Sequence, residues 1–182
     1  MKFFVISDTH GKINKVREVY EKLNNIDLII HLGDCEHDAK ALEVALEAPV
    51  VCVKGNMDGS YSSDDFKTLE TEYGKILLTH GHMDHVKTDN SRLLYRAEEN
   101  NCKAVLFGHT HTPYYNQVNG IYLLNPGSLP APRDGTQGSY GIITTTPTEF
   151  NCAIVYYSSL QGKNTKPVGG VLWDMLNNSD RF

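Results

Sequence analysis

Short apolar runs alternate with amphipathic stretches along the first half of the chain. Runs rich in Val, Ile, Leu and Phe over 3–7, 28–31 and 49–53 predict strands, and the stretches over 14–23 and 39–46 carry apolar residues at helical spacing. Strands that alternate with helices in this way are typical of βαβ units and of a largely parallel sheet. The pattern therefore predicts an α/β fold.

The second half of the chain is richer in strands. Residues 68–73 and 75–79 predict a hairpin that turns at Gly74, and Asn119-Gly120 is the strongest short hairpin signal in the chain. The other predicted elements are a helix over 91–100, a strand over 105–107, a hairpin of 114–118 with 121–124, and a strand pair over 140–145 and 150–157. Two sheets packed face to face, with helices outside them, would accommodate these elements.

Length and charge limit the classes of function that the chain can serve. A chain of 182 residues suits one domain with a substantial core. We expect a single domain over 1–182, with a core over about 1–158 and a C-terminal tail over 159–182, in which 171–176 can form a short docked helix. The formal net charge of −5 argues against a general affinity for nucleic-acid backbones or anionic membrane surfaces.

The opening run and the cysteines bear on the cellular compartment. Residues 1–6 are apolar, but the run ends far short of a signal-peptide core or a membrane span. The four cysteines stand singly, without a CxxC pair, which argues against disulfides and against a zinc knuckle. We therefore expect a cytoplasmic protein that does not engage membranes.

Polar residues beside a glycine follow five of the predicted strands. The segments are Asp8-Thr9-His10-Gly11, Gly33-Asp34, Gly55-Asn56-Met57-Asp58, His80-Gly81-His82 and Gly108-His109-Thr110-His111. Glycine permits a sharp turn and the close approach of a ligand, and ligands of open α/β sheets bind at the carboxyl edge of the strands. We expect the five segments to converge at that edge of one parallel sheet.

Each segment taken alone has a more ordinary interpretation. Asp8 or Asp34 can cap a helix, and Asn56 can serve a turn. The paired histidines can be polar loop residues. Five such endings in one sheet are harder to explain separately. Together they supply seven nitrogen and oxygen ligands without a thiolate, which exceeds one tetrahedral zinc and suits two divalent ions that share a carboxylate.

The ordered motifs DTH, GD, GNMD, HGH and GHTH resemble the signature of the calcineurin-like metallophosphoesterase superfamily. The short length is similar to that of its small prokaryotic phosphodiesterases, the YfcE-like branch, and the Asn-Pro-Gly-Ser sequence at 125–128 resembles a further loop of that branch. The resemblance implies an α/β fold of two mixed β-sheets packed as a sandwich and flanked by helices. It also implies hydrolysis of phosphodiester bonds.

The resemblance assigns the ligands of two divalent ions residue by residue. Mn²⁺ is the ion that it favours, and the ligand types also accept Mg²⁺, Ni²⁺, Zn²⁺ or Fe. A hydroxide that bridges the ions would attack phosphorus. Asp8, His10 and His111 would hold the first ion, Asn56, His80 and His109 the second, and Asp34 would bridge them. His109 and His111 would reach two neighbouring ions from the same side of an extended segment.

Two residues next to predicted ligands bear on the substrate. In many phosphomonoesterases of the superfamily, the residue after the metal-binding Asn is a His that can protonate the leaving group, and here it is Met57. Met57 therefore favours phosphodiesters, although it can also simply fill an apolar gap. His82 is the substitute polar group that we expect to act beside Asp34 and Asn56 in catalysis. The alternative is that His82 only supports a metal ligand through a hydrogen bond or faces solvent.

Two other functions stay open at this point. The same fold serves a retromer subunit whose metal site is partly degraded, so a protein-interaction scaffold is one alternative. A phosphomonoesterase or nucleotidase is the other. We expect a small phosphodiester as the substrate, and the family allows a homodimer. The loops over 59–66 and 83–90, with Tyr61, Asp64, Asp65 and His85, are expected to rim the cleft.

Overall fold

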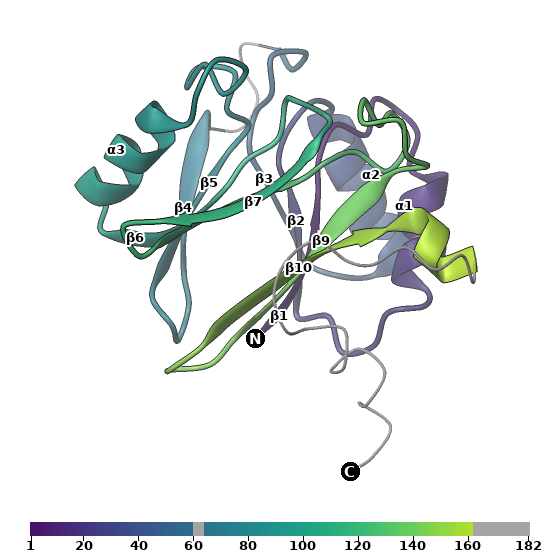
Figure 1. Ribbon diagram of the computed structural model, residues 1–182. Helices are drawn as coiled ribbons and strands as arrows, with labels where there is room; N and C mark the ends of the chain where they lie inside the picture. The colour runs from purple at the N-terminus through teal and green to yellow at the C-terminus, as the bar shows by residue number, and fades with distance from the viewer. Residues whose placement is uncertain (60–63, 162–182) are drawn as a thin grey trace.

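The computed structural model describes residues 1–59 and 64–161. Within this part, ten strands form two five-stranded mixed sheets that pack as a sandwich with three α-helices outside (Figure 1). The architecture agrees with the α/β sandwich predicted from the sequence. Tyr61 and the helix predicted over 171–176 lie outside the described residues.

The first sheet combines a parallel half with an antiparallel hairpin. Its strand β1 runs parallel to β2, which runs parallel to β3, whereas β9 runs antiparallel to both β1 and β10. The order across the sheet is β10 (Phe150–Tyr156), β9 (Ser139–Thr145), β1 (Lys2–Ile6), β2 (Leu28–His31) and β3 (Val50–Cys52). A 3₁₀-helix, η1 (Tyr157–Gln161), follows β10.

The second sheet has three parallel strands with an antiparallel strand at each edge. The order is β4 (Phe66–Glu70), β5 (Lys75–Thr79), β6 (Cys102–Leu106), β8 (Ile121–Pro126) and β7 (Pro113–Val118). The predicted hairpins are confirmed as β4–β5 and β7–β8. In the second, Asn119 and Gly120 have φ of 51° and 80°, and the left-handed conformation at both turn residues matches the twist of the flanking strands.

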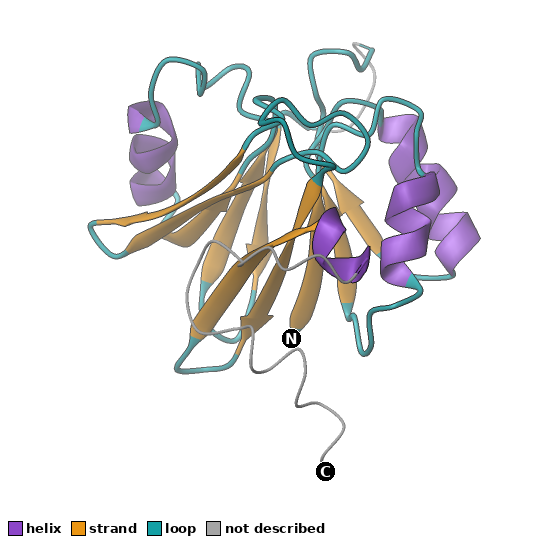
Figure 2. Ribbon diagram, turned by 45° about the vertical axis from the view of Figure 1, so that its right-hand side comes forward, coloured by secondary structure: helices purple, strands orange, loops and turns teal. Residues whose placement is uncertain are grey.

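The apolar run of β1 is continuous because both faces of this strand are covered. Phe3 and Val5 pack between the two sheets, and Phe4 and Ile6 pack beneath α1 (Asn14–Tyr20) on the outer face. The second helix, α2 (Glu36–Leu46), covers the same outer face, and α3 (Ser91–Glu99) covers that of the second sheet (Figures 1 and 2). None of the described helices is long and apolar enough to cross a membrane.

Two helix ends differ from the prediction, one because of a contact remote in sequence and one because of a local turn. Helix α2 begins at Glu36, three residues before the predicted start, because the Asp58 carboxylate accepts the amide protons of Cys35 and Glu36. Helix α1 ends at Tyr20, three residues before the predicted end. There the Leu23 amide bonds to the Tyr20 carbonyl, which makes a tighter final turn.

The loops at the carboxyl ends of the strands gather at one end of the sandwich, opposite the N-terminus (Figure 2). Three of the five predicted polar segments follow β1, β2 and β3 of the first sheet, and two follow β5 and β6 of the second. The expectation that they share one parallel sheet was therefore wrong. Apolar patterning identifies a buried strand, but it does not reveal which sheet the strand joins.

Candidate metal centre

One group of possible metal ligands joins the ends of β1 and β6. Asp8, His10 and His111 each offer an atom, and these atoms lie within 4.8 Å of one another. The Nε2 atoms of the two histidines are 3.3 Å apart, and the imidazole rings stack with centroids 5.0 Å apart. Asp8 and His111 are buried, whereas 31% of the His10 side chain is exposed. This first group is therefore fixed in the interior and open to solvent on the His10 side.

A second group lies beside the first. Asp34, His80 and His109 offer atoms that also lie within 4.8 Å of one another. The amide oxygen of Asn56 is 3.2 Å from His80 Nε2, which brings Asn56 to this group. These four residues follow β2, β5, β6 and β3, so four separate strand ends build the second group.

Asp34 lies between the two groups. Its Oδ1 is 3.4 Å from His80 Nε2 in the second group, and its Oδ2 is 3.9 Å from His10 Nε2 in the first. The carboxylate thus presents one oxygen to each group. This is the geometry that a carboxylate needs in order to be shared by two ions.

Backbone carbonyls orient two of the buried histidines. His111 Nδ1 is 2.7 Å from the Ala131 carbonyl oxygen, and His80 Nδ1 is 2.7 Å from that of Leu32. A carbonyl can only accept, so each Nδ1 carries the donated proton. In the neutral ring, Nε2 then keeps its lone pair and faces the group, which is the tautomer that a metal-binding histidine requires.

The donor set fits cations because acceptor atoms face one another. Oδ1 of Asp8 is buried, lies 3.3 Å from His111 Nε2, and has no hydrogen-bond partner among the described residues. In the second group, oxygens of Asp34 and Asn56 converge on His80 Nε2. Such an arrangement is unfavourable unless a positive charge lies between the acceptors. Mixed imidazole, amide and carboxylate ligands without a thiolate suit Mn²⁺, Fe, Zn²⁺ or Ni²⁺.

Burial and neighbouring charges shift the pKa values of His80, Asp34 and His109. Burial alone would lower the pKa of His80, but the nearby Asp34 and Asp8 carboxylates outweigh it and raise the pKa. Burial opposes ionisation of Asp34, yet its contacts with His80 and the Met57 amide hold the pKa of its carboxyl below the ordinary value. For His109, burial, followed by the charges of His80 and Lys87, lowers the pKa to about 4. His109 is therefore neutral and able to act as a ligand at physiological pH.

The ligand segments are not extended. The φ angles of Asp8, His10, Asp34, His109 and His111 lie between 46° and 69°, in the left-handed region. Non-glycine residues are uncommon in this conformation, and they are enriched at functional sites, where the surrounding contacts hold them. The two histidines of the last segment do reach different groups, but two left-handed residues direct them there and not the alternation of a strand. The predicted extended conformation was wrong.

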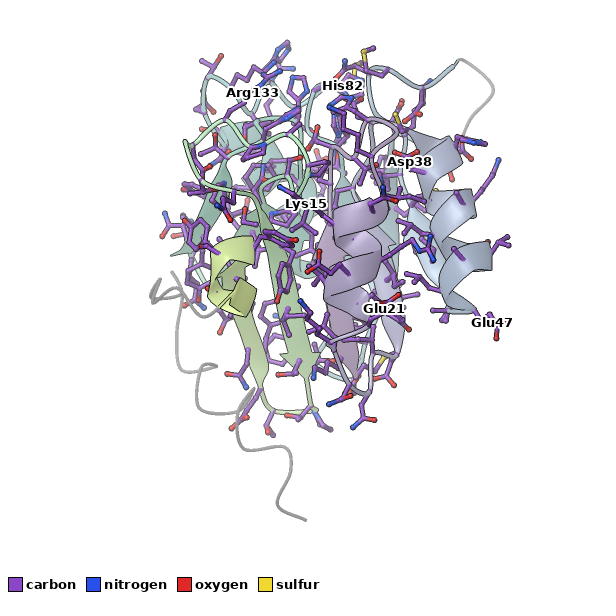
Figure 3. All side chains as sticks on the ribbon, turned by 90° about the vertical axis from the view of Figure 1, so that its right-hand side faces the viewer. Lys15, Glu21, Asp38, Glu47, His82 and Arg133 are labelled. Atoms are coloured by element: carbon purple, nitrogen blue, oxygen red, sulfur yellow. The ribbon has the colours of Figure 1, made fainter. Side chains whose placement is uncertain are left out.

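His82 and Met57 flank the second group. The His82 ring centroid is 5.4 Å from that of His80 and 6.1 Å from that of His109, and its buried Nδ1 has no hydrogen-bond partner among the described residues. His82 belongs to neither ligand group, and it lies at the edge of the sandwich where the strand ends meet (Figure 3). Met57 is 67% exposed, so it does not fill an apolar gap.

Other residues support the ligand segments from behind. The Asp58 carboxylate accepts the amide proton of Gly55 in addition to those at the start of α2, which gives Asp58 a structural role. In the 125–128 loop, Asn125 donates to the Gly108 carbonyl, and the Ser128 hydroxyl donates to the Asp8 carbonyl. Asp58 thus connects the Gly55 segment to α2, and residues 125–128 connect the Gly108 segment to the Asp8 segment.

Cys35 and four polar residues near the ligand groups differ in reactivity and exposure. Burial, reinforced by Asp38 and Asp58, raises the pKa of the Cys35 thiol, which makes the thiol less reactive toward oxidants. Asp64, Asp65 and His85, which the sequence places at the rim of the cleft, are exposed, and so is His37.

His31 is a buried, hydrogen-bonded core residue. Burial lowers its pKa to about 4. Between the unfolded value near 6.5 and about 4, the unfolded chain binds a proton that the folded chain does not, so acidification destabilises the fold. We expect His31 to remove roughly 2–3 kcal/mol of unfolding free energy between pH 7 and 4.5.

Urea unfolding of chelator-treated protein at the two pH values would measure this loss. His31→Gln should lose less stability on acidification, while the same change at exposed His37 should leave the loss unchanged. Equal pH dependence in the parent and in His31→Gln would contradict the prediction.

Comparison with known proteins shows which family the chain resembles. Residues 1–148 match the model of the calcineurin-like phosphoesterase superfamily domain. The probable metallophosphoesterase YsnB of Bacillus subtilis is 36% identical over 145 residues, which cover 79% of this chain and 84% of that protein. The phosphodiesterase YfcE of Escherichia coli K12 is 27% identical over 167 residues, covering 79% of this chain and 87% of YfcE.

A solved structure agrees with the architecture. The crystal structure of wild-type Vps29 from Entamoeba histolytica in complex with Zn²⁺ superposes with a TM-score of 0.75 at 23% identity, covering 92% of this chain and 97% of Vps29. At that identity the likeness concerns the fold. The family match and the relatives carry the assignment further: the chain belongs to the calcineurin-like phosphoesterase superfamily.

Proposed function

We propose that this protein is a two-metal phosphodiesterase. The observation that supports this most is the arrangement of Asp34 between two adjacent ligand groups, with one oxygen toward each. The phosphodiesterase name of its relative YfcE points the same way. Two divalent ions, for which we favour Mn²⁺, would supply Lewis acidity and a water of lowered pKa when bound.

The residues of the chain would divide the work. Asp8, His10 and His111 would hold one ion, Asn56, His80 and His109 would hold the other, and Asp34 would offer a carboxylate oxygen to each group. The neutral Nε2 atoms of the buried histidines serve as ligands because their Nδ1 protons are engaged by backbone carbonyls. Asn56 brings an uncharged oxygen, which keeps net positive charge available for an anionic substrate.

The substrate that we propose is a small phosphodiester. Met57 is exposed at the position where a histidine would otherwise protonate the poor leaving group of a monoester, and a thioether cannot donate a proton. His82 lies beside the second group with an unpartnered Nδ1, so we assign it to phosphate binding or to assisting the leaving group. A reducing cytoplasm is the proposed compartment, in keeping with the four free cysteines.

Hydrolysis of two chromogenic esters tests the proposal. Chelator-treated protein reloaded with Mn²⁺ should hydrolyse bis-p-nitrophenyl phosphate faster than p-nitrophenyl phosphate. Because p-nitrophenolate leaves either ester without a donated proton, this comparison reports which phosphate group the site accepts. His80→Ala should abolish turnover, and the matched change at exposed His37 should not. Absence of turnover with any divalent ion, from folded protein, would contradict the proposal and favour an interaction scaffold.

A further inference from the structure

A chain of buried hydrogen bonds lies behind the first ligand group. His31 Nε2 is 2.8 Å from Thr9 Oγ1, and the Thr9 hydroxyl donates to Asp38 Oδ2 over 2.6 Å. The same carboxylate oxygen accepts the Gly11 amide proton at 2.7 Å. His31 and Thr9 are fully buried, and Asp38 is 5% exposed at the start of α2 (Figure 3).

The donor in each of these hydrogen bonds can be assigned. The Gly33 amide donates to His31 Nδ1, so the proton of the neutral ring is on Nε2. His31 therefore donates to the Thr9 oxygen, and the Thr9 hydroxyl has its own proton free for Asp38. The result is a one-way relay of donors that ends on a carboxylate.

The position of Thr9 makes the relay relevant to the candidate metal centre. Thr9 stands between Asp8 and His10, two members of the first group, and both neighbours have left-handed φ of 55° and 46°. A backbone in this conformation needs external contacts to hold it. Thr9 points away from the ligands into the protein, where Asp38 and His31 hold it.

We propose that Thr9, Asp38 and His31 are positioning residues for the first ligand group. The inference rests on the proposed function, in that the first group is taken to bind a divalent ion. The second group is also held by contacts that the Thr9 hydroxyl does not make, namely Leu32 to His80 and Asp58 to Gly55. Loss of the Thr9 hydroxyl should therefore weaken one ion site and spare the other.

Metal titration of three threonine variants tests this selectivity. Thr9→Val removes the hydroxyl at nearly constant volume, and Thr9→Ser retains it. Thr145→Val makes the same Thr-to-Val change at a buried threonine far from the ligand groups, at the last residue of β9 and beside the N-terminal end of β1. Calorimetric titration with Mn²⁺ gives the affinities, and ¹¹³Cd NMR of Cd²⁺-loaded protein gives one signal for each site.

Thr9→Val should lose about 10–100-fold in affinity at one of two sites, which is the usual cost of removing a group that orients a metal ligand. Thr9→Ser and Thr145→Val should stay near the parent at both sites. Should Thr9→Val fail to fold, Asp38→Ala removes the same acceptor and should show the same selective loss, with Asp38→Asn closer to the parent.

The proposal is overturned if Thr9→Val binds both ions as the parent does, if it weakens both equally, or if Thr9→Ser is as weak as Thr9→Val. A parent protein that binds no divalent ion would instead overturn the proposed function. The two failures are thus separated by the parent titration alone.

Discussion

Replacement of Asp34 with asparagine is expected to lower diester turnover by at least about a thousandfold, which corresponds to roughly 4 kcal/mol of transition-state stabilisation. Asp34 is the carboxylate that faces both ligand groups. The amide keeps the shape of the side chain but has one acceptor oxygen in place of two, and it has no charge. The single amide oxygen can serve only one ligand group, so we expect the protein to lose one of its two ions.

Turnover of bis-p-nitrophenyl phosphate and the metal content of the dialysed protein measure this effect together. Asp27→Asn makes the same chemical change at an exposed carboxylate whose Oδ2 accepts the Lys2 amide proton, at the N-terminal end of β1, and should retain both ions and full activity. Asp34→Asn with parental turnover and two bound ions would show that Asp34 is not shared between them.

Replacement of Gly55 with alanine is expected to disrupt both the fold and the second ligand group. A Cβ at Gly55 would overlap the backbone nitrogen and the Oδ1 of Asp34. The backbone cannot move aside as a flexible side chain can, so either the 55–58 loop or Asp34 must shift. We expect a loss of roughly 1–3 kcal/mol in the free energy of unfolding, as is usual for overpacking, together with weaker metal binding.

Gly59→Ala is the matched control for this variant. A Cβ at Gly59 meets no atom of the described residues within 4 Å, and Gly59 lies in the same loop region. Urea unfolding and calorimetric titration with Mn²⁺ should therefore give parental values for Gly59→Ala and reduced values for Gly55→Ala. Parental stability and affinity in both variants would mean that the loop accommodates the methyl group, contrary to the prediction.

Much of the fold could be predicted because its determinants are local. The run over 3–7 is apolar throughout since both faces of β1 are covered, and Asn119-Gly120 has the residue types that a tight hairpin turn requires. The polar segments at strand ends were equally visible, because a glycine beside a potential ligand is a local signal. The division of their residues into two ligand groups came from the resemblance to the metallophosphoesterase superfamily and not from the spacing of the segments.

What the sequence did not reveal depends on contacts between distant segments. The start of α2 at Glu36 needs Asp58, which lies more than twenty residues further along the chain. The relay from His31 through Thr9 to Asp38 joins the end of β2, the loop after β1 and helix α2, and none of its members has a local signal that distinguishes it. Left-handed conformations at Asp8 and His10 were also missed, since non-glycine residues adopt them only when tertiary contacts compel them.

The division of each ligand group between the two sheets has a mechanical consequence. Asp8 and His10 follow a strand of the first sheet and His111 follows a strand of the second, and the second group is divided in the same way. An ion bound in either group would join the two layers of the sandwich. The layers could then not shear past each other near this end without first releasing the ion, so bound ions should make opening of the sandwich at this end rarer.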